Sequence, residues 1–212
     1  MIDFHTHILP NVDDGASSIE EAIEMIKFLK ARGFNGVVAT PHANSLYYPK
    51  REILQEKRNE ILKNEDFKII IGYEVRIDAI EVFDIQYFLI EGTNYILLEL
   101  NFLEKPKKLI EPFIKVMKFG LRPIIAHPER YHYLSIEEIK EIRDLGVILQ
   151  VNLKSLKGFY GNDVREKALK IFDICDLIGS DAHSIKDYEK LNSFELYEKK
   201  DFSKFILNTL KF

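Results

Sequence analysis

Seven short apolar runs recur along the chain, and most of them lead through a loop into a segment with the spacing of an amphipathic helix. The runs predict strands at 2–4, 36–40, 67–71, 95–100, 122–126, 147–152 and 176–179. The helical segments lie at 19–29, 50–64, 106–119, 135–145 and 163–172, and an amphipathic helix is also expected from about 194. Strands that alternate with helices form parallel sheets, because each helix returns the chain to the start of the next strand. The pattern therefore predicts an α/β fold with a closed or nearly closed barrel.

Two points of the fold stay open at this level. The segment 76–92 is apolar without a clear period and receives no assignment. An open doubly wound sheet is the alternative architecture, but it requires a point where the strand order reverses, and the sequence indicates none. No linker, repeat or low-complexity segment divides the 212 residues, so a single domain over 1–212 is expected.

Composition argues against several classes of protein. Thirty Lys and Arg against 34 Asp and Glu give a net charge of −4, which disfavours nucleic acid and anionic membranes as partners. The one cysteine, Cys175, rules out an internal disulfide, fits a reducing compartment and is expected to be buried. No charged leader and no uninterrupted apolar stretch of about 18 residues is present, so we expect no membrane insertion and a cytoplasmic location.

The first sixteen residues, MIDFHTHILPNVDDGA, carry a candidate half of a metal site. His5 and His7 are two positions apart at the end of a predicted strand, so both imidazoles point to the same side. Asp13 and Asp14 follow in a loop, where a carboxylate could complete the site. A histidine pair at a strand end also arises by chance, so the rest of the chain has to decide between the two interpretations.

Ionisable side chains stand at or just after the ends of most other apolar runs. Together with the first pair they are His5, His7, Asp14, His42, Glu74, Glu99, His127, Asp181 and His183. Each alone could cap a turn or join an ion pair, but the carboxyl ends of barrel strands converge, and unpaired burial costs several kcal/mol per group. Imidazoles and carboxylates without a thiolate favour Zn, Mn or Fe, and this many ligands implies two or three ions.

The chain also resembles a known family. The runs MIDFHTHILPNVDDGA, VVATPHAN, IIGYEVRI, YILLELNF, PIIAHPERY, LQVN and IGSDAHS occur in this order over almost its whole length. In these runs it is similar to the PHP (polymerase and histidinol phosphatase) family of metal-dependent phosphoesterases, and within it to the bacterial capsule-associated protein-tyrosine phosphatases. The resemblance implies a single-domain distorted (β/α)7 TIM-like barrel.

The resemblance further implies a trinuclear site, usually supported by manganese, whose ligands are the same nine residues. Arg130, in the run PIIAHPERY, is implied to engage the phosphate. The implied reaction is hydrolysis of a phosphomonoester by a hydroxide that bridges the metal ions. The implied substrate is a phosphotyrosine segment of a bacterial tyrosine kinase that governs capsule or exopolysaccharide export.

The chain departs from the family at Tyr188, where related proteins carry an arginine, and this leaves a second phosphate contact and the exact substrate open. Tyr47, Tyr48 and Phe102 are candidate walls for a substrate ring, with ordinary packing as the alternative for each. His132 is the spare histidine, and we expect it at the surface or in packing rather than as a general acid.

Three other functions stay open. A histidinol-phosphate phosphatase and a nucleotide or nucleic-acid phosphoesterase belong to the same family, and the acidic balance disfavours a nucleic-acid substrate. A catalytically decayed metal-binding module that docks a kinase is the alternative of another class. The complete ligand set together with Arg130 argues against decay.

Overall fold

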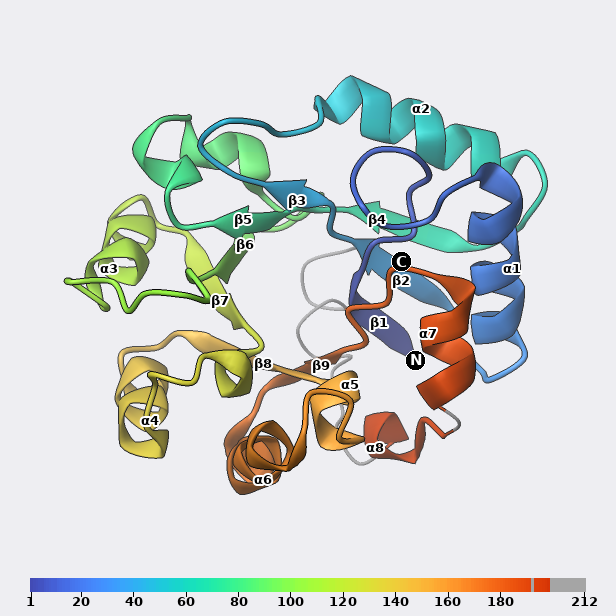
Figure 1. Cartoon of the computed structure of the whole chain (residues 1–212). Helices are drawn as coiled ribbons and strands as arrows, with labels where there is room; N and C mark the ends of the chain where they lie inside the picture. The colour runs from blue at the N-terminus through green and yellow to red at the C-terminus, as the bar shows by residue number, and fades with distance from the viewer. Residues whose placement is uncertain (192, 199–212) are drawn as a thin grey trace.

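The computed structural model describes residues 1–191 and 193–198, and its strands curl round a centre with the helices on the outside (Figure 1). All strand pairs are parallel and form two sheets with the orders β1-β2-β4 and β3-β5-β6-β7-β8-β9. The strands are β1 Ile2–Thr6, β2 Gly36–Ala39, β3 His42–Ala43, β4 Lys68–Ile71, β5 Glu74–Arg76, β6 Tyr95–Glu99, β7 Arg122–Ala126, β8 Ile148–Asn152 and β9 Leu177–Gly179. Each predicted strand is present, so the α/β prediction is confirmed.

The two sheets join where the last strand returns to the first. The Asp181 backbone N–H donates to the His5 carbonyl at 2.7 Å, and the His7 N–H donates to the Ala182 carbonyl at 2.9 Å. Thr6 and Ala182 form an isolated parallel bridge. The barrel prediction is therefore confirmed, and the open doubly wound alternative is wrong, because β1 lies between β2 and the chain that leaves β9.

The barrel is distorted on one side. The second predicted strand corresponds to β2, and a separate short strand, β3, follows after Thr40-Pro41. The third corresponds to β4, and β5 follows after Gly72-Tyr73. Neither β3 nor β5 was predicted. Proline cannot donate to a ladder, which favours the break at Pro41. Between β4 and β6 the chain at 90–91 fills the gap, with the Glu91 N–H donating to the Ile71 carbonyl at 2.8 Å.

Five helices follow the predicted segments, one of them with a later start, and the helices at 153–156 and 185–191 were not predicted. The α-helices are α1 Ile19–Lys30, α2 Arg51–Leu62, α3 Glu111–Lys118, α4 Ile136–Asp144, α5 Leu153–Leu156, α6 Asn162–Ile171, α7 Ile185–Leu191 and α8 Glu195–Glu198. The predicted start of α3 at 106 is wrong: Pro112, at the first turn of the helix, marks the start instead of Pro106. The predicted tail helix is described only as α8, and its remainder lies outside the described residues.

The unassigned segment 76–92 owes its lack of period to 3₁₀ structure. It contains η1 Ala79–Glu81 and η2 Ile85–Phe88, and two further 3₁₀ turns, η3 Pro128–Arg130 and η4 Phe172–Ile174, follow β7 and α6. Turns of three residues per repeat do not produce the amphipathic spacing of an α-helix. Cys175 is buried, as expected. In the described part of the chain, no helix has the length and apolarity needed to cross a membrane.

A buried polar network braces the barrel where it closes. The Tyr188 hydroxyl of α7 lies 2.8 Å from Asp3 Oδ2 and 3.0 Å from Thr6 Oγ1, both on β1. The other oxygen of Asp3, Oδ1, accepts the Ser180 N–H at 2.9 Å, just after β9. Tyr188 is fully buried, so its side chain acts in the core and ties α7 to the first strand.

We predict that Tyr188→Phe lowers the free energy of unfolding by about 1–2 kcal/mol, because a buried hydrogen-bonded carboxyl group loses a donor. Denaturant unfolding followed by circular dichroism measures the change. Tyr47→Phe is the matched control, since the Tyr47 side chain is 58% exposed and its hydroxyl loss should have no measurable effect. Equal stability of Tyr188→Phe and wild type would contradict the bracing role.

Candidate metal centre

The nine predicted ligands come together at the carboxyl end of the barrel. Their ligand atoms form three overlapping groups, each with all atoms within 4.8 Å of one another: His5, His7, Glu74 and Asp181; His7, Asp14, His42 and His183; and His42, Glu74 and Glu99. The ninth residue, His127, places Nε2 2.7 Å from Glu74 Oε1. Glu74 thus lies at the centre of the cluster, between the residues from the first half of the chain and those from the second.

The first two histidines are oriented by partners outside the cluster. His5 Nδ1 lies 3.0 Å from Gln150 Oε1, and His7 Nδ1 lies 2.7 Å from Asp13 Oδ2. Both rings therefore turn Nε2 inward, and the two Nε2 atoms are 3.3 Å apart. A histidine whose outer nitrogen donates to an oxygen keeps the lone pair of the inner nitrogen for a metal ion.

The structure separates the roles of the two loop aspartates, which the sequence leaves open. Asp14 belongs to a ligand group. Asp13 instead accepts hydrogen bonds from the backbone N–H groups of Gly15 and His42, at 3.0 Å each, in addition to its contact with His7. These donors and the charge of His7 outweigh burial and lower the pKa of Asp13 to about 2. Asp13 is therefore an anionic support for His7.

Two glycines make room for the histidines. A Cβ atom on Gly179 would lie 2.4 Å from His5 Cβ and 2.7 Å from Gln150 Nε2. A Cβ atom on Gly15 would lie 2.1 Å from the His7 carbonyl oxygen. None of these three distances is possible for a real Cβ atom. The close approach of these segments to His5 and His7 therefore requires glycine at both positions.

The backbone is strained at two of the predicted ligands. His127 has φ +35° and Asp181 has φ +54°, and only one further non-glycine residue in the described ranges, Asn11, has positive φ. Residues other than glycine rarely adopt this left-handed backbone conformation. It persists where the surrounding structure enforces it, often at functional sites. Here it turns the chain sharply at the ends of β7 and β9 and directs both side chains into the cluster.

Burial shifts the pKa values of two of the predicted ligands. Burial raises the pKa of Glu99 to about 8, and the nearby charge of Glu74 adds to the effect. Burial also lowers the pKa of His127 to about 4, so this imidazole is neutral. Glu74 Oε2 is buried, 3.2 Å from His5 Nε2 and 3.0 Å from His42 Nδ1, without a hydrogen-bond partner in the described structure.

Divalent ions fit this arrangement. They would satisfy the orphaned oxygen of Glu74 and the inward nitrogen atoms together, and they would relieve the repulsion between the buried carboxylates. The separations between ligand atoms also agree with a shared ion, since all the atoms of each group lie within 4.8 Å of one another. The residues present therefore suit metal ions with oxygen and nitrogen ligands.

Arg130 lies beside this cluster, in η3. Its Nη1 donates to Asp181 Oδ2 at 2.9 Å, and the guanidinium is partly exposed. Sequence reasoning missed two neighbours, Asn152, whose Nδ2 donates to the same oxygen at 2.7 Å, and Tyr160, whose hydroxyl lies 3.3 Å from it. Asn152 ends the run LQVN, one of the runs that carry the family resemblance, so the sequence could have indicated it as a site residue. No motif in the sequence indicates Tyr160.

The candidate aromatic walls have different positions. Phe102 stacks on the His127 ring with a centroid distance of 5.5 Å, so it borders the cluster. Tyr47 is exposed. Tyr48 packs edge-on against the rings of Phe83 and Phe88, which is the packing role that the sequence also allowed.

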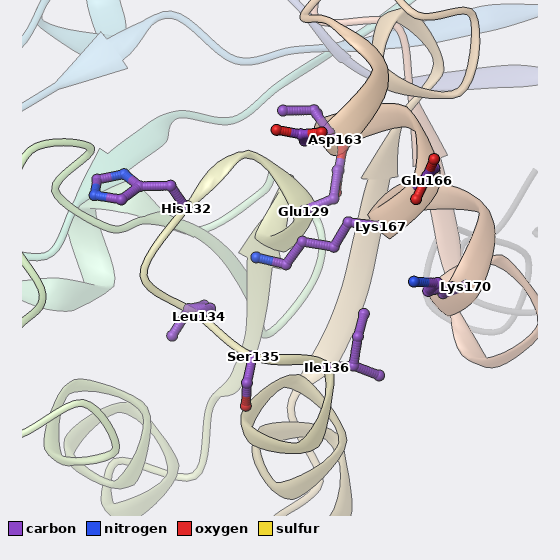
Figure 2. A pocket seen from close by; sticks show the side chains of 10 residues that line it. Glu129, His132, Leu134, Ser135, Ile136, Asp163, Glu166, Lys167 and Lys170 are labelled. Carbon is purple, nitrogen blue, oxygen red and sulfur yellow. The ribbon is translucent and has the colours of Figure 1, made fainter.

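The spare histidine, His132, is exposed and borders a different cavity. That cavity, of about 400 Å³, lies between η3 and α6, and none of the nine predicted ligands lines it (Figure 2). His132 also packs edge-on against Tyr133. The structure thus gives it the surface position that the sequence indicated.

Comparison with known proteins agrees with this geometry. A family model described as "Capsular polysaccharide synthesis, CpsB/CapC" matches residues 1–202. The chain belongs to this family. CapC of Staphylococcus aureus is 35% identical over 198 residues, which cover 87% of this chain and 78% of the relative. The tyrosine-protein phosphatase YwqE of Bacillus subtilis is 31% identical over 204 residues, which cover 88% and 78%.

A solved structure supports the same assignment. It comes from work on YwqE of Bacillus subtilis and CpsB of Streptococcus pneumoniae, which are described as metal-dependent tyrosine phosphatases. The TM-score is 0.79 at 27% sequence identity, and the match covers 96% of this chain and 89% of the other. The resemblance indicated by the motifs is confirmed, and with it the distorted barrel.

We predict that Asp13→Asn lowers the affinity for Mn²⁺ by about 10–100-fold, because His7 loses the anion that orients it and raises its basicity. Isothermal titration calorimetry on the metal-stripped protein measures the affinity. Asp163→Asn, in the first turn of α6 and on the separate cavity, is the matched control and should bind like wild type. Unchanged Mn²⁺ affinity in Asp13→Asn would contradict the supporting role.

Proposed function

We propose that this protein is a metal-dependent protein-tyrosine phosphatase. The observation that carries the proposal is the convergence of nine histidine, aspartate and glutamate side chains beside Arg130, in a chain of the CpsB/CapC family. The ligands are His5, His7, Asp14, His42, Glu74, Glu99, His127, Asp181 and His183. Relatives described as metal-dependent tyrosine phosphatases support this choice of reaction.

The number of ions follows from the grouping of the ligands. Three overlapping groups, each with three or four ligand atoms, favour three divalent ions over two, and His7, His42 and Glu74 each belong to two groups. Mixed imidazole and carboxylate ligands suit manganese, which is our preferred metal, with iron or zinc as alternatives. When bound, ions of this kind lower the pKa of water and neutralise the oxygens of a transferring phosphoryl group.

The chain's own residues bind and orient the substrate. The guanidinium of Arg130 presents a planar fork of N–H groups, and one of them is bound to Asp181. The others can donate to phosphate oxygens, where they stabilise the charge that develops during transfer. The phenol of tyrosine has a pKa of about 10, so tyrosinate can leave without being fully protonated. The reaction therefore does not depend on a general acid.

The substrate in this proposal is a phosphotyrosine in a flexible segment of a bacterial tyrosine kinase that governs capsule or exopolysaccharide export. An open face made of loops admits an extended chain, whereas a small metabolite usually calls for an enclosing lid. The family's description as capsular polysaccharide synthesis supports this partner. The proposal includes a single domain over 1–212 and a cytoplasmic location, where such a kinase segment would be met.

We predict that Arg130→Ala lowers kcat/KM for p-nitrophenyl phosphate by roughly two decades, because an electrostatic clamp on the phosphate is lost. The manganese content, measured by mass spectrometry, should stay near wild type. Arg143→Ala is the control: Arg143 donates to the Ile174 carbonyl at 2.8 Å, remote from the cluster, and its loss should leave turnover unchanged. Wild-type activity in Arg130→Ala, or loss of its metal, would show that the role is wrong.

We also predict a substrate preference. The kcat/KM for a phosphotyrosine peptide should exceed that for histidinol phosphate and for a nucleoside monophosphate, and all activity should vanish on exhaustive chelation and return with Mn²⁺. If either small molecule is hydrolysed about tenfold more efficiently than the peptide, the tyrosine-phosphatase assignment fails while the metallophosphatase assignment stands. Absence of turnover on every substrate in the Mn-loaded protein would favour the kinase-docking alternative.

A further inference from the structure

The guanidinium of Arg130 lies over two aromatic rings. Its Cζ atom is 4.6 Å from the ring centroid of Phe102 and 4.2 Å from that of Tyr160. The three residues come from three different loops of the barrel face: Phe102 follows β6, Arg130 follows β7, and Tyr160 stands between α5 and α6. Aromatic rings within about 6 Å of a guanidinium attract it through the negative electrostatic potential of the ring face. The loops of Phe102 and Tyr160 therefore both restrict its position.

Both rings are themselves held in place. Phe102 stacks on the His127 ring at an interplanar angle of 20° and also contacts the Tyr131 ring at 5.2 Å. The Tyr160 hydroxyl lies 3.3 Å from Asp181 Oδ2, the oxygen that also accepts a hydrogen bond from Arg130. Each ring is therefore anchored on a residue of the metal cluster, His127 on one side and Asp181 on the other.

This arrangement determines which part of Arg130 a ligand can reach. Two nearby rings restrict the guanidinium, and its Nη1 atom is bound to Asp181, so the remaining N–H groups are the ones left for a ligand. Those groups suit two oxygens of a phosphate. A free arginine would populate many rotamers at this partly exposed position, and ordering them on binding costs free energy.

We infer that Phe102 and Tyr160 are positioning residues that hold the guanidinium of Arg130 in the orientation that binds phosphate. The contribution of Arg130 to kcat/KM then depends on its contact with the Tyr160 ring. The inference rests on the proposed phosphatase function for the identity of the ligand. It gives Phe102 a role different from a wall for the substrate ring, and it assigns a role to Tyr160, which no motif marks.

A double-mutant cycle tests this directly. Tyr160→Leu should lower kcat/KM for p-nitrophenyl phosphate by about tenfold, mainly through KM, because the stacking contact that orders Arg130 is lost. In the Arg130→Ala background the same change should alter kcat/KM by less than about twofold, since the side chain on which Tyr160 acts is absent. Tyr160→Phe keeps the ring and should stay within about threefold of wild type.

Each alternative role predicts a different result. If the hydroxyl of Tyr160 mattered through Asp181, Tyr160→Phe would be as damaging as Tyr160→Leu and would lose manganese, and the inference would be overturned. Equal effects of Tyr160→Leu with and without Arg130 would also overturn it. Phe159→Leu, which removes the neighbouring exposed ring, is the matched control and should not change kcat/KM.

A second measurement separates this inference from the proposed function. Nitrogen-15 relaxation of the Arg130 side-chain Nε–H group in the metal-stripped protein should show a rigid group in wild type and Tyr160→Phe, and a mobile one in Tyr160→Leu. Equal rigidity in all three would overturn the inference. If wild type hydrolyses no phosphomonoester, the proposed function fails, whereas the relaxation data still decide whether Tyr160 restrains Arg130.

Discussion

The structure depends on the burial of many ionisable groups at one end of a parallel barrel. Carboxylates and imidazoles buried together are costly unless each charge is balanced or hydrogen-bonded, and the cost per isolated group is several kcal/mol. The pKa of Glu99 is raised to about 8, first by burial and then by the nearby charge of Glu74, which illustrates this cost. Divalent ions would balance the buried charges, and the surrounding structure holds the ligands where such ions would need them.

Asp181 connects the metal cluster with the phosphate-binding arginine. Its Oδ1 atom faces His5 and His7, at 3.6 and 3.5 Å from their Nε2 atoms. Its Oδ2 atom accepts hydrogen bonds from Asn152 and Arg130. One carboxylate would therefore set the distance between ions held by the cluster and the arginine, and a phosphoryl group bound to both would have to match that distance. The left-handed backbone of Asp181 is the strain that this position requires.

Much of the fold follows from the sequence because the apolar runs and the strand ends have simple physical consequences. Parallel strands align their carboxyl ends, so the sequence alone predicts that His5, Glu99 and His127 lie on one face of the barrel. The strands β3 and β5 do not follow from the sequence, since two and three residues are too few to show a period. Tyr160 was missed because it is brought to Arg130 by α5, a four-residue helix without a hydrophobic pattern.

The cluster at the carboxyl end of the barrel should hold divalent ions. Anomalous diffraction at the manganese absorption edge, from crystals grown with Mn²⁺, locates such ions directly. We expect peaks within the three ligand groups, beside Arg130. Fully occupied manganese elsewhere on the protein and none within these groups would contradict the account.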